Sequence, residues 1–161
     1  MKRMTPAPPT RDLRHDALEA FVGEWTAERE SFGGPNQDPE RPRANAQRWT
    51  SKHSARWHTG RFFLIQDERA HTPDPFDTLG VIGWDEEKSS YFLQSFENHG
   101  YERRYGLAVD GRVWTLTGKT ERARIEFSED GSRQTIRWEW RPKDAWLPLC
   151  GRVAIRQAAR R

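Results

Sequence analysis

Histidines are the first residues in this 161-residue chain with the chemistry for acid–base work. His53 stands four residues after Trp49, so in a strand both would face one side, and an imidazole on an aromatic wall suits a general base. His58 takes the opposite parity to Trp57. A hydrogen-bonded structural role is the alternative for either imidazole, and the sequence leaves both roles open.

An arginine between two phenols is the second candidate group. Tyr101, Arg103 and Tyr105 alternate, so one strand would present all three on the same face. If that face points inward, the guanidinium suits a carboxylate or a developing enolate oxygen. The alternative is a cation stacked on aromatic rings at the outer surface.

Glu139, between Trp138 and Trp140, is the third candidate and the best carboxylate for a general acid or base. Burial against the indoles would raise its pKa, as that role requires. The alternative is a solvent-facing Glu139 that pairs with an arginine of its own or a neighbouring strand, for which the chain offers Arg122, Arg124 and Arg137.

The elements that must position these residues are one helix and a long run of strands. We expect residues 1–10 to be a disordered lead, residues 11–157 a β-barrel domain and residues 158–161 a basic tail. A helix is predicted over 11–22, capped by Thr10 or Asp12. Turn residues such as Asp110-Gly111 recur about every ten residues, which favours an antiparallel meander. The strands are predicted over 23–32, 44–54, 56–67, 78–84, 90–96, 101–108, 112–118, 121–127, 134–140 and 146–156.

Several short segments, in their order and spacing, carry a resemblance to a known family. They are Leu18 to Trp25 with its Gly23-Glu24-Trp25, then 60–63, 79–85, 114–118 and 137–148. The chain resembles an uncharacterised bacterial family of lipocalin-like domains, related to the nitrobindins within the calycin superfamily. The resemblance implies an all-β fold, a single antiparallel up-and-down β-barrel of about ten strands with one N-terminal helix, holding a small and mostly apolar molecule.

Two residue roles come with that resemblance. Trp25 would close the barrel floor, and a basic residue of the last strand, Arg152 or Arg156, would stack across it. Nitrobindins ligate haem through a histidine near the end of the chain. Here no histidine follows His99, so we expect no haem and no other cofactor.

Composition narrows the remaining classes of function. The 27 basic and 24 acidic residues are interspersed, with no block of five like charges, so no nucleic-acid partner is expected. No His, Asp or Glu spacing matches a metal signature. No apolar run is long enough to span a membrane, and no secretory signal is present, so no membrane insertion is expected. Cys150 is the single cysteine, which favours a reducing cytoplasm.

The leading hypothesis is therefore a cytoplasmic carrier or sensor, monomeric or homodimeric, that binds a small hydrophobic or aromatic molecule in its lumen. One alternative is a small cofactor-independent enzyme of the cyclase, isomerase or dehydratase type that uses the same cavity. Another is a barrel filled by its own side chains that acts as an interaction module. The candidate catalytic residues are His53, Arg103 and Glu139, and the candidate ligand-binding residues are Trp49, Phe62, Gln66, Tyr91, Tyr105 and Trp138.

Overall fold

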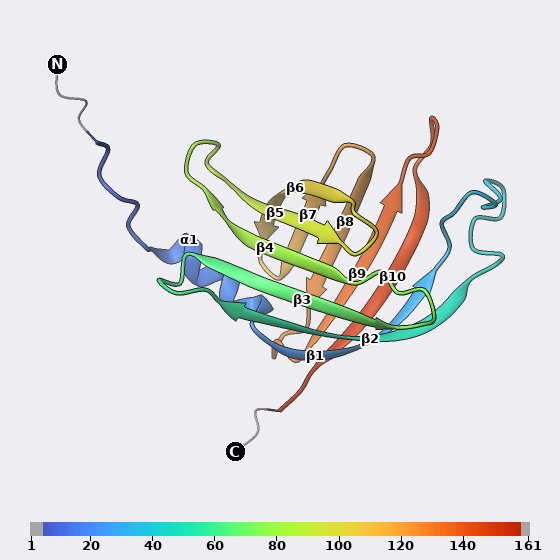
Figure 1. Ribbon diagram of the computed structural model, residues 1–161, viewed down its shortest axis with the longest axis horizontal. Helices are drawn as coiled ribbons and strands as arrows, with labels where there is room; N and C mark the ends of the chain where they lie inside the picture. The colour runs from blue at the N-terminus through green and yellow to red at the C-terminus, as the bar shows by residue number, and fades with distance from the viewer. Residues whose placement is uncertain (1–4, 159–161) are drawn as a thin grey trace.

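The protein is a closed antiparallel β-barrel with a short helical segment at one end (Figure 1). The computed structural model describes residues 5–158. Each strand pairs with the next along the chain, and β1 also pairs with β10 to close the barrel. The strands are β1 (Gly23–Ser31), β2 (Gln47–Trp57), β3 (Phe63–His71), β4 (Thr78–Asp85), β5 (Ser90–Glu97), β6 (Glu102–Asp110), β7 (Val113–Thr117), β8 (Glu121–Phe127), β9 (Arg133–Trp140) and β10 (Leu147–Arg156).

The predicted fold class, a single up-and-down barrel of about ten strands with one N-terminal helix, is confirmed. Tight turns make the meander possible, because Gly111 and Gly131 adopt φ values of 58° and 74°, a region that glycine enters freely. The predicted boundary between the second and third strands is wrong. The turn between the second and third strands lies at 58–62, where Gly60 has a φ of 89°, and not at Ala55.

The helical segment differs in detail from the single helix expected over 11–22. It consists of α1 (Leu13–Asp16) followed by the 3₁₀ helix η1 (Ala17–Phe21). Asp12 caps the start, because its Oδ1 accepts a hydrogen bond from the backbone N–H of Arg14 at 2.9 Å. The three-residue period of η1 brings Leu18 and Phe21 to one side, and both are buried in the barrel. The segment thereby closes one end of the barrel.

Trp25 forms the floor at this closed end. It is 1% exposed, and its Nε1 donates to the backbone oxygen of Phe21 at 3.1 Å. The guanidinium of Arg156 lies 4.6 Å from the centre of the indole, so the predicted cation from the last strand is confirmed for this residue. Gly23 permits the contact, because a Cβ there would lie 3.3 Å from Nη1 of Arg156. Arg152 does not share this role, since it points into the barrel interior.

The two ends of the chain were predicted to be a disordered lead and a basic tail. Residues 5–12 have no regular secondary structure, whereas 1–4 of the predicted lead and 159–161 of the predicted tail lie outside the described residues. Of the two basic residues that the sequence offered for stacking on Trp25, Arg152 is buried and Arg156 is held over the indole. Within residues 5–158, every helix is too short or too polar to cross a bilayer.

Candidate functional site

A buried ionic cluster occupies the middle of the barrel. Arg29 donates from Nη1 to Oε1 of Glu68, and Arg152 donates from Nη1 to Oε2 of the same carboxylate. Arg152 also donates from Nη2 to Oε1 of Gln134 at 3.0 Å. The side chains of Arg29, Glu68 and Arg152 are only 10%, 5% and 6% exposed. One carboxylate therefore holds two guanidiniums inside the protein.

Strand register explains why these side chains meet. Arg29 on β1 lies directly opposite Arg152 on β10, and both follow the inward parity of Trp25 and Ala154. Glu68 enters from β3, on the other side of β2. Two like charges directly opposite each other would destabilise the sheet, and the shared carboxylate offsets that repulsion.

His53 lies beside this cluster. It is opposite Glu68 in the β2–β3 pair, and its Nδ1 is 3.9 Å from Oε2 of Glu68. Its ring stacks parallel to the Trp25 indole, with 5.8 Å between the ring centres. The structure therefore confirms that the imidazole points into the interior.

Burial and charge set the protonation states of these groups. Burial alone would raise the pKa of Glu68, but the two guanidiniums and His53 together lower it to about 2. Burial, helped by Arg152, lowers the pKa of His53 to about 3 despite Glu68. At neutral pH the cluster thus combines two cations, one carboxylate and a neutral imidazole, which leaves one positive charge in excess.

Several buried polar atoms around the cluster have no hydrogen-bond partner among the described residues. They are Nε of Arg29, Nε of Arg152, Oγ of Ser51 and both ring nitrogens of His53. Buried polar atoms in native proteins are nearly always satisfied by protein, water or ligand. Each of these atoms can therefore form a hydrogen bond with water or with a ligand.

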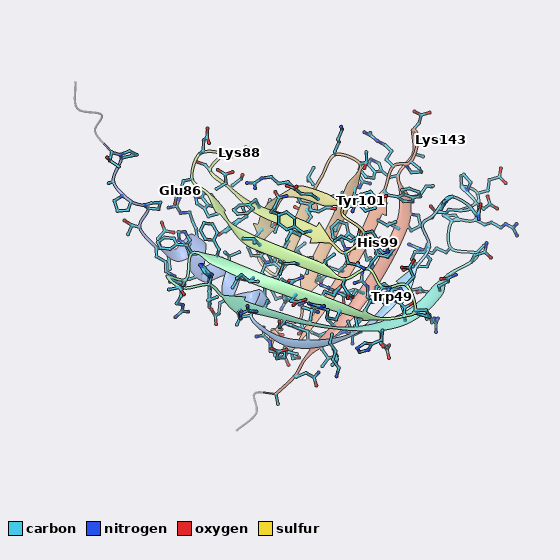
Figure 2. All side chains as sticks on the ribbon, in the orientation of Figure 1. Trp49, Glu86, Lys88, His99, Tyr101 and Lys143 are labelled. Carbon is cyan, nitrogen blue, oxygen red and sulfur yellow. The ribbon has the colours of Figure 1, made fainter. Side chains whose placement is uncertain are left out.

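Aromatic side chains surround the cluster on the side of the barrel's open end. Arg29 lies 4.3 Å from the centre of the Trp49 ring, and Nε1 of Trp49 donates to Oγ of Ser31 at 2.9 Å. Tyr105 and Trp138 pack edge to face with 5.2 Å between their centres. In Figure 2, Trp49 lies towards the end of the barrel opposite to Glu86.

Tyr105 is fixed by a polar contact as well as by packing. Its hydroxyl donates to Oε2 of Glu121 at 2.6 Å, and burial together with this bond raises the pKa of the phenol. Cys150 lies nearby on β10, with its Sγ 3.9 Å from Nη2 of Arg29. Burial raises the pKa of this thiol, so it is a poor nucleophile at neutral pH.

Of the residues proposed from the sequence, His53, Trp49, Gln66, Tyr105 and Trp138 all follow the inward parity of their strands. His53 and Tyr105 are buried, and the other three are half-buried. Tyr91 also points inward, but at the closed end, where its hydroxyl donates to the backbone oxygen of Arg14 at 2.7 Å. Its ring packs on Trp114, which makes it part of the floor.

Three of the candidate residues from the sequence do not lie in the barrel interior. Glu139 is on the outer face, where its Oε1 accepts from Nε of Arg122 at 2.9 Å, because Trp138 takes the inward position of the alternation. Arg103 is exposed at the rim, over Tyr101 at 4.8 Å and 3.6 Å from Glu121. Phe62 precedes β3 and packs edge to face on His15 of α1, with 5.1 Å between ring centres.

The sequence interpretation missed the residues that dominate the interior: Arg29, Glu68, Gln134 and Arg152. A signal for two of them was present. Arg29 shares the parity of Trp25 and Ala27, and Glu68 shares that of Leu64, so each places a charge on an apolar face. A charge on the core side of a strand indicates a buried partner.

Metal-ligand groups and surface grooves complete the description of possible sites. Among residues 5–158, no group of three or more His, Cys, Asp or Glu side chains is placed to hold a metal ion. Two grooves, of about 860 Å³ and about 500 Å³, lie on the outer surface of the barrel. The first crosses β7 to β10, and the second crosses β1 between β2 and β10.

Comparison with known proteins gives a family and a fold. The model of a family described as "Protein of unknown function (DUF1579)" matches residues 10–143. No curated protein sequence matches the chain. Together with the barrel, the family match confirms the resemblance to an uncharacterised lipocalin-like family.

Three solved structures share the fold. The protein Rv2717c from M. tuberculosis has a TM-score of 0.65 at 15% identity, over 89% of this chain and 96% of that one. Zebrafish ileal bile acid-binding protein, complexed with cholic acid, has a TM-score of 0.55 at 11% identity, over 86% and 99%. The S-type phycobiliprotein lyase CPES from Guillardia theta has a TM-score of 0.50 at 11% identity, over 90% and 93%.

Proposed function

Since the chain belongs to this family of proteins of unknown function, we propose a function from its own geometry. The barrel binds a small organic molecule that has an apolar body and an anionic group. The body contacts the aromatic side chains towards the open end, and the anionic group reaches the guanidinium of Arg29. Trp49, Tyr105 and Trp138 supply the apolar contacts.

The observation that carries the proposal is the excess positive charge inside the barrel. Arg29 and Arg152 share the single carboxylate of Glu68, while the lowered pKa of His53 keeps its imidazole neutral. An uncompensated buried charge is costly, so an anion that enters the lumen gains an electrostatic attraction strengthened by the low dielectric. The unpartnered Nε of Arg29 and Oγ of Ser51 offer hydrogen bonds to it.

The fold accommodates a ligand of this kind, because the zebrafish bile acid-binding protein was solved in complex with cholic acid. Acid–base catalysis in the same lumen has less support. An imidazole with a pKa of about 3 is a weak base at neutral pH, and both carboxylate oxygens of Glu68 are engaged. A cytoplasmic location remains part of the proposal, since one cysteine, Cys150, needs no oxidising compartment.

The test compares two fluorescent probes of similar shape. One is the anion 8-anilinonaphthalene-1-sulfonate and the other is neutral N-phenyl-1-naphthylamine. We expect Arg29→Gln to weaken binding of the anionic probe about tenfold, or ~1.4 kcal/mol, and that of the neutral probe much less. Arg48→Gln is the matched control, because Arg48 follows the outward parity of β2 and its side chain is 86% exposed.

Circular dichroism and thermal melting confirm that each variant is folded before titration. Equal loss of both probes in Arg29→Gln would refute a role for its charge. Equal weakening by Arg29→Gln and Arg48→Gln would show surface attraction instead of lumen binding. If neither probe binds the wild type, the barrel is not a binder of this ligand class. Native mass spectrometry after incubation with an extract of the source organism would then identify the natural ligand.

A further inference from the structure

The larger outer groove, of about 860 Å³, is lined by a row of outward positions that crosses five strands. These positions face one another in successive strand pairs: Thr115, Arg124, Arg137, Gly151 and Glu30. A second carboxylate, Glu139, also lines the groove and is paired with Arg122. Phe32 and Arg43, which follow β1 in the chain, line one side, with the guanidinium of Arg43 5.2 Å from the centre of the Phe32 ring. The groove is large enough for a small molecule.

Two arginines of this row have little ionic compensation among the described residues. Arg124 lies directly opposite Arg137 in the β8–β9 pair, so their Cβ atoms are about 4.5–5.5 Å apart and the like charges repel. Within residues 5–158, Arg137 makes no ion pair. Arg124 is ion-paired with Glu126 on its own strand at 3.5 Å, and both side chains are more than half exposed. Such an exposed pair contributes little.

A second pair of facing arginines lies in the barrel interior, and there a carboxylate compensates the two charges. Arg29 and Arg152 are also directly opposite each other on neighbouring strands, and the carboxylate of Glu68 bridges them. No described carboxylate bridges Arg124 and Arg137. We propose that the groove binds a phosphate monoester, whose phosphoryl oxygens bridge these two guanidiniums as Glu68 bridges the inner pair.

The chemistry of the groove favours a phosphoryl group over a carboxylate. Each guanidinium presents a planar fork of donors, and a phosphoryl group offers the two forks one more acceptor oxygen than a carboxylate does. A phosphate monoester carries three terminal oxygens and close to two negative charges at neutral pH. Arg43 adds a further cation at the groove edge, whereas the charge of Arg122 in the lining is offset by Glu139. Phe32 offers an apolar surface to the organic part of the ester.

Gly151 keeps this groove open. A Cβ at this position would meet its nearest neighbour, the backbone oxygen of Ile136, at 3.8 Å, which is an ordinary van der Waals contact. A larger residue therefore fits the strand and fills the groove from its floor. Gly151→Val tests the site by shape while leaving every arginine in place.

The experiment is calorimetric titration of the full chain with phenyl phosphate and with inorganic phosphate, at constant ionic strength set with chloride. We expect a Kd for phenyl phosphate on the order of 0.1–1 mM, with inorganic phosphate weaker. Arg124→Gln, Arg137→Gln and Gly151→Val should each weaken phenyl phosphate at least about tenfold. Arg56→Gln is the matched control, because Arg56 is an exposed β2 residue opposite Ile65 instead of an arginine.

Thermal unfolding without phosphate gives a second measurement, which shows whether each variant is folded and whether the two arginines repel each other. Relief of the repulsion should raise the midpoint of thermal unfolding of Arg137→Gln above that of the wild type at low salt, and by less at high salt. A fully folded Arg137→Gln with unchanged phosphate affinity overturns the proposal. Equal weakening by Arg56→Gln also overturns it, since it would indicate general attraction of anions. An oligonucleotide is titrated in the same way. If it binds tightly, and Arg56→Gln weakens its binding as much as Arg137→Gln does, the surface is a diffuse nucleic-acid site and the proposal is overturned.

Discussion

His53 should make the protein lose stability on mild acidification, before most carboxylates titrate. Burial lowers the pKa of its imidazole to about 3 in the native state, with Arg152 adding to the effect. In the unfolded chain the pKa returns to 6.5. Between these values the unfolded chain binds a proton that the native protein does not, so stability is full above pH 6.5 and falls as the pH falls towards 3.

The magnitude follows from the two pKa values. At pH 5 almost no native molecule carries the proton on His53, whereas the unfolded chain is protonated with a pKa 1.5 units higher than the pH. Each unit corresponds to about 1.4 kcal/mol, so the free energy of unfolding should fall by about 2 kcal/mol between pH 7 and pH 5. This is a large part of the ~5–15 kcal/mol by which native proteins are usually stable.

The assay is urea unfolding at pH 7 and pH 5 for the wild type and for His53→Phe. Phenylalanine preserves a planar ring against Trp25 but cannot be protonated. We expect the variant to lose about 2 kcal/mol less than the wild type across this interval, whatever its absolute stability. His58→Gln is the matched control, because His58 is exposed in the turn before β3.

Equal acid sensitivity of the wild type and His53→Phe would refute the reasoning, since the imidazole would then be free to take up a proton in the native barrel. His99 cannot imitate the effect. Its hydrogen bonds to Asp74 and Glu97 raise its pKa, so the stability it contributes is fully present below pH 6.5 and is lost as pH rises through the raised value.

Three further predictions concern packing and charge. Trp25→Ala should lower the free energy of unfolding by roughly 3–5 kcal/mol in urea titrations, because the floor loses a buried indole and its contact with Arg156. Unchanged melting would contradict this. Glu68→Gln should cost about 3–5 kcal/mol in the same assay, since two buried guanidiniums lose their shared charge, and adding Arg29→Met should recover part of the loss. A double variant less stable than the single one would argue against charge repulsion. Tyr91→Phe should cost about 1 kcal/mol, measured by thermal and urea unfolding, because its hydroxyl ties β5 to the helical segment. No loss would mean that water replaces this bond.

Much of the fold was predictable because strand alternation and turn chemistry are local. Ile136, Trp138 and Arg137 illustrate this, since alternation put the first two on the face opposite to the third, and the structure shows that the first two face inward. The same alternation put Glu139 on the face of Arg137, which the structure shows to be the outer one, whereas its position between two tryptophans had made it a candidate. The turn at Gly60 was harder to predict, because a glycine marks a turn but does not say how far each strand extends.

The sequence by itself determined a run of about ten antiparallel strands after one helical segment, and its resemblance to a lipocalin-like family implied the barrel, the tryptophan floor and a cation across it. Only the tertiary structure decided that Arg29, Glu68 and Arg152 form one cluster and that Arg124 faces Arg137 outside. Parity shows to which side of the sheet a residue points. It does not show at what height, because the barrel closes through the pairing of β1 with β10, which are more than a hundred residues apart in the chain. That closure sets the register across the lumen, and the register sets which charges meet.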